Sequence, residues 1–233
     1  MPDAVKPPQR GAKKYVRGAA QHSKRSRSCH PAGKRTIFTV GHSTRTLPDF
    51  IHLLKAHGVK RLVDIRSIPR SRHTPQFNRE VLAARLRSAG LSYVYLKRLG
   101  GRRHARKGSV NLGWRNASFR GFADYMQTPE FAAGLRRLAN LAESKPTAIL
   151  CAEAVPWRCH RSLIGDALLI RGFRVLDILS RSVAKPHQLT AFARVRGSSL
   201  TYPSPHGKSA AICGSLAAAR AISAAERRKP RIR

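Results

Sequence analysis

The chain has 233 residues, of which 46 are Lys or Arg and 11 are Asp or Glu, so its formal net charge at pH 7 is +35. This balance favours nucleic acid or another phosphate-bearing polyanion as a partner. No apolar run approaches the roughly 18 residues of a membrane span, and the N-terminal residues lack the apolar stretch of a secretory signal. We therefore expect no contact with a membrane.

Composition divides the chain into three parts. Residues 1–35 carry 10 basic residues and almost no periodic apolar ones, which predicts a disordered basic arm. The composition loosens again from residue 197, which predicts a basic, mostly disordered tail over residues 197–233. The expected single domain, residues 36–196, keeps 29 of the basic and 9 of the acidic residues, so it is basic in its own right.

The four cysteines, at positions 29, 151, 159 and 213, are too few and too scattered for a disulfide framework. This pattern is typical of a reducing compartment. We therefore expect a cytoplasmic protein.

The middle of the chain alternates between strand and helix patterns. In order, we expect a strand over residues 36–40, a helix that Thr46 caps and Gly58 ends, a strand over 62–65, a helix over 79–89 and a strand over 91–96. A long connection over residues 97–121 precedes a helix over 128–144, a strand over 147–150, a helix over 159–170 and a strand over 174–179. The alternation predicts one α/β domain: a mostly parallel sheet of about five strands, with helices on both faces.

The chemically dense motifs follow the predicted strands. They are Gly41-His42-Ser43, Asp64-Ile65-Arg66, Cys151-Ala152-Glu153 and the later run Cys159-His160-Arg161. In a parallel sheet these motifs meet at one edge, outside the carboxyl ends of the strands, where such folds bind ligands.

A phosphate site is the first function that these motifs suggest. Backbone N–H groups and the side chains of His42 and Ser43 precede a helix, and Arg66 and Arg161 are candidate partners for the same anion. The alternative is an ordinary turn between a strand and a helix.

Two acidic residues are candidates for proton transfer. Asp64 lies in an apolar strand, where an unpaired carboxylate is costly, so it needs a partner such as Arg66. Asp64 and Glu153 at neighbouring strand ends would form a general acid–base pair or hold a divalent metal ion. The alternative is a structural network of carboxylate and arginine.

Cys151 permits three interpretations. It is a nucleophilic thiolate activated by His160 and Arg161, or a metal ligand together with Cys159, His160 and His42, or a buried packing residue. The spacing of the cysteines is diagnostic of none of these, so no metal site is assigned.

The connection over residues 97–121 holds eight Lys or Arg residues. Long connections within a compact domain are usually functional or disordered. We expect nucleic-acid contacts from its residues Arg102, Arg103, Arg106, Lys107 and Trp114. The alternative is that its aromatic residues only anchor it to the core.

Taken together, the segments TVGHST, VDIRSIPRSR, LGGRR, WRNASFRGFADYM and LCAEAVPWRCHR resemble the family known as domain of unknown function 488, over about residues 36–203. The resemblance implies a compact α/β domain of prokaryotes. Labels carried by similar proteins sometimes mention DNA repair. The residues here that correspond to the family's motifs are His42, Ser43, Asp64, Arg66, Cys151, Glu153, Cys159, His160 and Arg161.

Two functions remain open at this point. One is an enzyme that performs hydrolysis or group transfer on nucleic acid or a nucleotide-like phosphorylated substrate. The other is an accessory protein that binds nucleic acid without catalysis.

Overall fold

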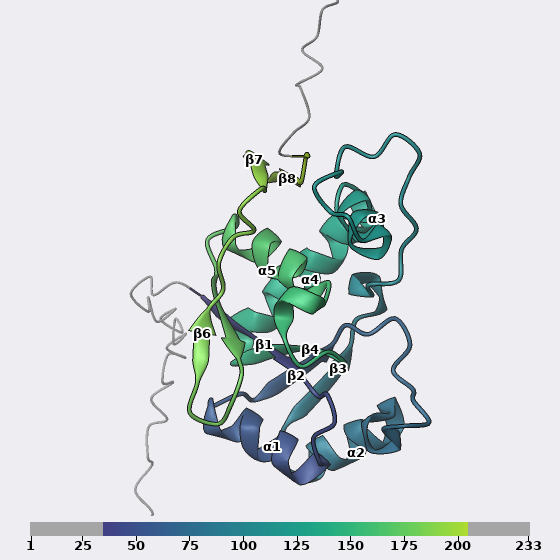
Figure 1. Cartoon of the computed structure of the whole chain (residues 1–233). Helices are drawn as coiled ribbons and strands as arrows, with labels where there is room; N and C mark the ends of the chain where they lie inside the picture. Colours follow the sequence, from purple (N-terminus) through teal and green to yellow (C-terminus); the bar gives the residue numbers. More distant parts are fainter. Residues whose placement is uncertain (1–34, 205–233) are drawn as a thin grey trace, which may run out of the picture. The chain divides into compact units, whose positions relative to one another are not determined.

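The computed structural model describes residues 35–204 and contains one six-stranded sheet with the strand order β3-β2-β4-β1-β5-β6 (Figure 1). The strands are β1 (Thr36–Gly41), β2 (Arg61–Asp64), β3 (Ser92–Tyr95), β4 (Thr147–Cys151), β5 (Arg174–Ile178) and β6 (Ala184–Pro186). All pair in parallel except β6, which runs antiparallel to β5. The arm over residues 1–34 and the tail from residue 205, both predicted to be disordered, lie outside the described residues.

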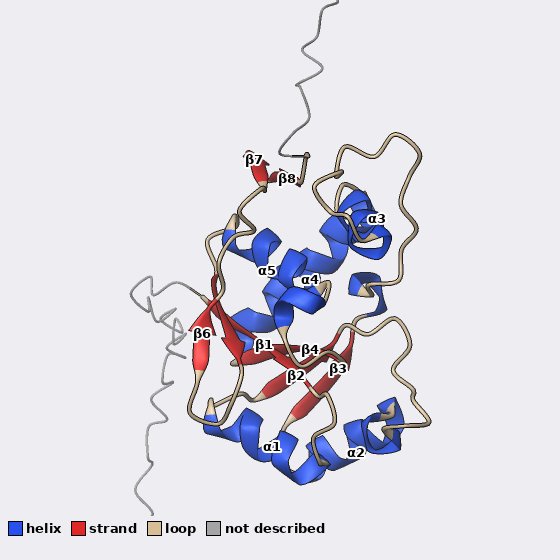
Figure 2. Ribbon diagram, viewed as in Figure 1, coloured by secondary structure: helices blue, strands red, loops and turns tan. Residues whose placement is uncertain are grey.

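Helices cover both faces of the sheet, α1 and α2 on one and α3, α4 and α5 on the other (Figure 2). They are α1 (Leu47–Ala56), α2 (Arg79–Ser88), α3 (Ala117–Tyr125), α4 (Pro129–Ser144) and α5 (Arg161–Leu169), with short 3-10 turns at Pro75–Phe77, Lys97–Leu99 and Pro156–Arg158. Within residues 35–204 no helix is long and apolar enough to cross a bilayer.

The single α/β domain with a mostly parallel sheet is confirmed, and the five predicted strands and four predicted helices lie where the sequence indicates. The cap residues act as expected: the Thr46 hydroxyl accepts a hydrogen bond from the Asp49 N–H, and Gly58 follows α1 with a φ of +66°.

Four elements were missed. Strands β6, β7 (Arg194–Arg196) and β8 (Ser199–Thr201) are each only three residues long, too short for a periodic pattern. Helix α3 begins inside the predicted connection. The Asn116 side chain caps it by accepting hydrogen bonds from the N–H groups of Ser118 and Phe119.

The central strand β4 divides the core into two parts. Ala148 and Leu150 pack with α1 and α2, whereas Ile149 packs with α4 and α5. All five residues of β4 are buried, which the continuous apolar run of a parallel strand predicts.

Packing continues beyond residue 196, where the change in composition suggested the end of the domain. Leu200 and Tyr202 are buried in the core on the α4 and α5 side. The Tyr202 hydroxyl donates to Asp166 of α5 at 2.9 Å. The residues after β7 therefore help to close that face of the domain.

A buried histidine with two carboxylates joins this C-terminal segment to the sheet. Nε2 of His187 lies 3.2 Å from Asp166, and Nδ1 lies 2.9 Å from Asp177. Burial alone would lower the pKa of His187, but its hydrogen bonds to Asp166 and Asp177 raise it to about 9. Since its side chain is only 6% exposed, the imidazolium is the buried counterion of both carboxylates.

The raised pKa predicts a pH-dependent stability. Protonated His187 stabilises the fold fully below about pH 6.5, and this contribution is lost as the pH rises through about 9. We expect this contribution to the free energy of unfolding, about 3 kcal/mol, to disappear between about pH 6 and pH 10, as measured by urea unfolding at a series of pH values.

The His187→Gln variant should lack this component, whereas His52→Gln, at an exposed site on α1, should keep it. Parallel pH profiles of the unmodified chain and His187→Gln would contradict the assignment.

Candidate active site

The register of the three central strands brings distant motifs to one edge of the sheet. Strand β4 lies between β1 and β2, with Gly41 opposite Cys151 and Asp64 opposite Leu150. Because all three strands run in parallel, the segments that follow them leave the sheet side by side.

A cavity of about 350 Å³ opens at this edge and is called the strand-end cavity below. Its lining comes from the segments after β2 and β4, the start of the long connection, and the residue before α5. The lining residues are Arg66, Ser67, Ile68, Arg70, Gly101, Arg102, Cys151, Ala152, Glu153 and His160. Five residues singled out from the sequence thus lie in one place: Arg66, Arg102, Cys151, Glu153 and His160.

Asp64 and Arg66 form a buried ion pair beside this cavity. Nη2 of Arg66 donates to Asp64 at 2.6 Å and to the carbonyl of Phe77 at 2.8 Å, and the Tyr93 hydroxyl donates to Asp64 at 2.7 Å. Burial alone would lower the pKa of Arg66, but the hydrogen bonds and charge of Asp64 raise it. Burial and the Asp64 charge raise the pKa of Tyr93, so the phenol stays a donor.

Asp64 is 0% exposed and does not line the cavity. Its two oxygens accept hydrogen bonds from Arg66 and Tyr93. The geometry therefore fits the structural alternative for Asp64, and it leaves Glu153, which is exposed and lines the cavity, as the available carboxylate.

The turn after β1 is built differently from the expected phosphate cradle. The N–H of His42 donates to the carbonyl of Cys151 at 3.1 Å, and the N–H of Ser43 donates to that of Ala152 at 2.8 Å. The pairing with β4 thus continues beyond the end of the strand and occupies both backbone donors. The bend falls at Ser43, whose φ is +49°.

His42 is buried and stacks on Phe77 with ring centroids 4.3 Å apart. Burial lowers its pKa, so the ring is neutral. Nδ1 donates to the carbonyl of Ser43 at 2.9 Å, and Nε2 faces Nη1 of Arg66 at 3.4 Å. His42 therefore orients Arg66 rather than reaching the strand-end cavity.

Two thiols and an imidazole meet at the inner end of the cavity. Nδ1 of His160 lies 3.9 Å from Sγ of Cys151 and 3.6 Å from Sγ of Cys159. The hydrogen bond from Cys159 is the main cause that lowers the pKa of Cys151 well below its usual range, with His160 and Arg161 adding to it. That same hydrogen bond, together with burial, raises the pKa of Cys159. Cys151 is thus the thiol that ionises first.

Arg161 lies beneath the segment after β4 and does not line the cavity. It is 1% exposed, and one of its nitrogens, Nη2, donates to the carbonyl of Ala154 at 3.3 Å. Among residues 35–204 its Nε and Nη1 have no hydrogen-bond partner, and no carboxylate pairs with it. Its positive charge therefore acts on the neighbouring thiols, as expected for the interpretation of Cys151 as a thiolate activated by His160 and Arg161.

The arginine-rich connection is partly exposed and partly anchored. Arg102, Arg106 and Lys107 are exposed, whereas the guanidinium of Arg103 lies 3.8 Å from the centre of the Tyr125 ring. Only Arg102 among them lines the strand-end cavity.

Trp114 is half-buried, with its ring 4.8 Å from Phe119, 5.0 Å from Phe192 and 5.5 Å from Tyr202 between centroids. This packing matches the alternative in which the aromatic residues of the connection anchor it to the core.

The polar residues that hold the connection in place were not predicted from the sequence. Asp124 of α3 accepts hydrogen bonds from the N–H of Arg106 at 2.9 Å, the hydroxyl of Ser109 at 2.5 Å and the amide of Asn111 at 2.8 Å. Asn111 in turn accepts from the N–H of Tyr202 at 2.9 Å. A buried acid within the apolar run FADYM was the available signal.

Gly101 has a steric role beside the thiols. A Cβ atom at this position would overlap the His160 ring, so the second glycine of Leu99-Gly100-Gly101 lets the connection pass against the imidazole.

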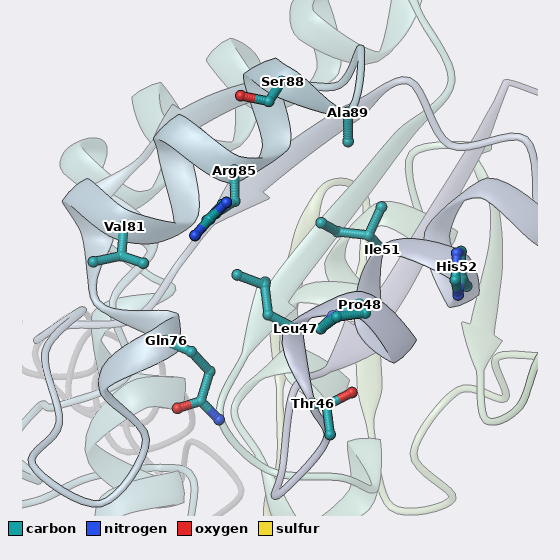
Figure 3. A pocket seen from close by; sticks show the side chains of 10 residues that line it. All are labelled: Thr46, Leu47, Pro48, Ile51, His52, Gln76, Val81, Arg85, Ser88 and Ala89. Atoms are coloured by element: carbon teal, nitrogen blue, oxygen red, sulfur yellow. The ribbon is translucent and has the colours of Figure 1, made fainter.

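A second hollow lies between α1 and α2 and has a volume of about 750 Å³ (Figure 3). It is lined by Thr46, Leu47, Pro48, Ile51, His52, Gln76, Val81, Arg85, Ser88 and Ala89. Its lining, as the described residues form it, holds neither a thiol nor a carboxylate. The strand-end cavity brings a thiol, a carboxylate and an imidazole together and is the candidate active site.

Residues 46–168 match the family model described as domain of unknown function DUF488. The match covers a little more than half of the 233 residues and confirms the resemblance that the motifs indicate. Neither a curated protein nor a solved structure matches the chain.

The buried pair of Asp64 and Arg66 generates a prediction on stability. Replacing Asp64 with Asn leaves the guanidinium of Arg66 buried without its counterion, which typically costs about 3–5 kcal/mol. We expect the Asp64→Asn variant to lose this much free energy of unfolding in urea titrations.

Glu143→Gln is the matched control, since it breaks an ion pair with Arg35 in which both side chains are about half exposed. Its loss should stay below about 1 kcal/mol. If Asp64→Asn unfolds at the same urea concentration as the unmodified chain, the structural role of Asp64 is wrong.

Proposed function

The chain belongs to the DUF488 family, and on the geometry of the strand-end cavity we propose that it is an enzyme acting on a phosphate-bearing substrate, either nucleic acid or a nucleotide-like molecule. The observation that carries the proposal is the shared lining of this cavity by Cys151, Glu153 and His160 with two exposed arginines, Arg70 and Arg102.

The charge of the lining supports an anionic substrate. Arg66 is neutralised by Asp64, whereas Arg70 and Arg102 form no ion pair within the described residues. Guanidinium groups bind phosphate through paired hydrogen bonds, so these two side chains are the expected phosphate contacts. A volume of about 350 Å³ suits a phosphate with part of its sugar or leaving group.

The reactive groups support hydrolysis or group transfer. In hydrolysis, Glu153 accepts a proton from water as the water oxygen bonds to phosphorus, and the P–O bond to the leaving group breaks. The departing oxygen then takes up that proton. In group transfer, the Cys151 thiolate bonds to phosphorus instead as the P–O bond to the leaving group breaks. An acceptor hydroxyl then bonds to phosphorus, the S–P bond breaks, and Glu153 takes the hydroxyl proton.

Both routes need substrate at the same edge of the sheet. Nucleic acid as the substrate would be consistent with a role in DNA repair. A free nucleotide would instead place the chain in small-molecule metabolism.

Replacing Glu153 with Gln tests the catalytic role directly. General acid–base groups contribute roughly 100- to 10,000-fold to rate, so we expect turnover to fall by that factor while affinity changes by less than about twofold. Turnover is measured on a radiolabelled single-stranded oligonucleotide and on p-nitrophenyl phosphate, with the full chain. Unchanged turnover in Glu153→Gln would contradict the role of Glu153.

Replacing Arg102 with Ala tests the phosphate contact. Loss of a charge-assisted hydrogen bond should weaken binding of adenosine monophosphate by about tenfold or more, measured by isothermal titration calorimetry. Arg87→Ala is the matched control, because it also removes one exposed arginine. Arg87 lies in the last turn of α2, shortly before β3 begins, and therefore at the edge of the sheet opposite the strand-end cavity. Equal effects of the two variants would contradict a specific site.

A non-catalytic nucleic-acid-binding protein is the second candidate. The exposed side chains of Arg102, Arg106 and Lys107 favour it, because they follow one another along the connection and would neutralise a phosphate backbone. For this candidate, Glu153→Gln leaves oligonucleotide binding unchanged. Replacing Arg106 and Lys107 reduces the slope of the logarithm of the binding constant against the logarithm of salt concentration by about one unit per lost phosphate contact.

A further inference from the structure

The cluster at the inner end of the strand-end cavity has the composition and spacing of a metal site. We propose that Cys151, Cys159 and His160 bind one zinc ion, with the fourth coordination position open toward the strand-end cavity. The ligand atoms of these three residues all lie within 4.8 Å of one another.

The distances between ligand atoms fit tetrahedral coordination. With Zn–S near 2.3 Å and Zn–N near 2.0–2.1 Å, a sulfur and a nitrogen on one tetrahedral ion lie about 3.6 Å apart. Nδ1 of His160 lies 3.6 Å from Sγ of Cys159 and 3.9 Å from Sγ of Cys151. Small side-chain movements therefore suffice to close the three ligands around an ion.

Two groups of Arg161 favour the thiolate form that a metal needs. The backbone N–H of Arg161 points at Sγ of Cys159, with a distance of 3.4 Å, and the unpaired guanidinium of Arg161 places a positive charge nearby. Both stabilise thiolate over thiol. Two thiolates and one imidazole are ligands that zinc prefers.

The imidazole is fixed in place and lacks another strong partner. Gly101 passes against the ring, and Phe122 meets it edge-on, with centroids 5.0 Å apart. Its Nε2 is buried without a hydrogen-bond partner in the described part of the chain, and Nδ1 faces only the two sulfurs. A cation bound at Nδ1 would therefore lie between the imidazole and both sulfurs.

The open position gives the metal a chemical role that rests on the proposed function. Cys151 and His160 line the strand-end cavity, whereas Cys159 lies behind it. Zinc bound there would polarise a phosphate oxygen or a water molecule facing the arginines. Cys151 would then be a ligand rather than a nucleophile, and Glu153, two residues further on, would accept the proton in the hydrolytic route.

The test measures metal binding without substrate. The full chain is purified with reduced thiols and stripped of metal by a chelator. One metal-free sample is titrated with Zn²⁺, and a second is titrated with Co²⁺ as a spectroscopic probe. We expect one ion per chain, with thiolate-to-cobalt charge-transfer absorption and the d–d bands of tetrahedral Co²⁺. Cys159→Ser should weaken Zn²⁺ binding at least 100-fold, whereas the Cys29→Ser/Cys213→Ser variant should bind like the unmodified chain.

X-ray absorption of the zinc-loaded, unmodified chain keeps the test independent of how the variants fold. The proposal requires two sulfur neighbours near 2.3 Å and one imidazole nitrogen near 2.0–2.1 Å. Substoichiometric zinc on reduced thiols, a zinc shell of oxygen and nitrogen alone, or unchanged affinity in a folded Cys159→Ser variant would overturn it. Zinc binding without phosphate binding would instead overturn the proposed function and leave the metal site standing.

Discussion

The parallel pairing of β4 with β1 and β2 determines where the candidate site forms. Its register sets Gly41 opposite Cys151 and Asp64 opposite Leu150, so three segments far apart in sequence leave the sheet at one edge. The same pairing extends to the N–H groups of His42 and Ser43. It therefore creates the strand-end cavity and also uses up the backbone donors that a phosphate would otherwise find there.

The second determinant of the site is the group that balances the positive charge of each of two buried arginines. Arg66 has a carboxylate, Asp64, and is held by four hydrogen bonds to it and to Phe77. Arg161 has no carboxylate partner among residues 35–204 and lies beside the thiols of Cys151 and Cys159. One arginine thus belongs to the scaffold, and the other provides the positive charge that makes anionic sulfur favourable.

Most of the fold could be predicted from the sequence, because apolar periodicity and cap residues are local signals. Thr46 and Gly58 marked the ends of α1, and the continuous apolar run of β4 marked a buried central strand. Helix α3 was missed, since its segment is only nine residues long and begins inside the arginine-rich connection; the Asn116 cap was its local signal.

The location of the candidate site could be predicted as well, because the ends of parallel strands meet wherever the strand assignments are right. The roles of individual residues could not, since they depend on contacts between distant segments. Whether Asp64 faces a substrate or a guanidinium is decided by Tyr93 and Arg66 around it. The connection depends on Asp124, an acid within the apolar run FADYM, but the groups that bond to it come from residues 106–111 and follow only from the fold.

A crystal structure of the full chain grown with inorganic phosphate would show directly where the anion binds. We expect a phosphate in the strand-end cavity, within hydrogen-bond distance of Arg70 or Arg102 and facing Cys151 and His160. Phosphate bound only along Arg106 and Lys107, with water alone in the cavity, would contradict this expectation.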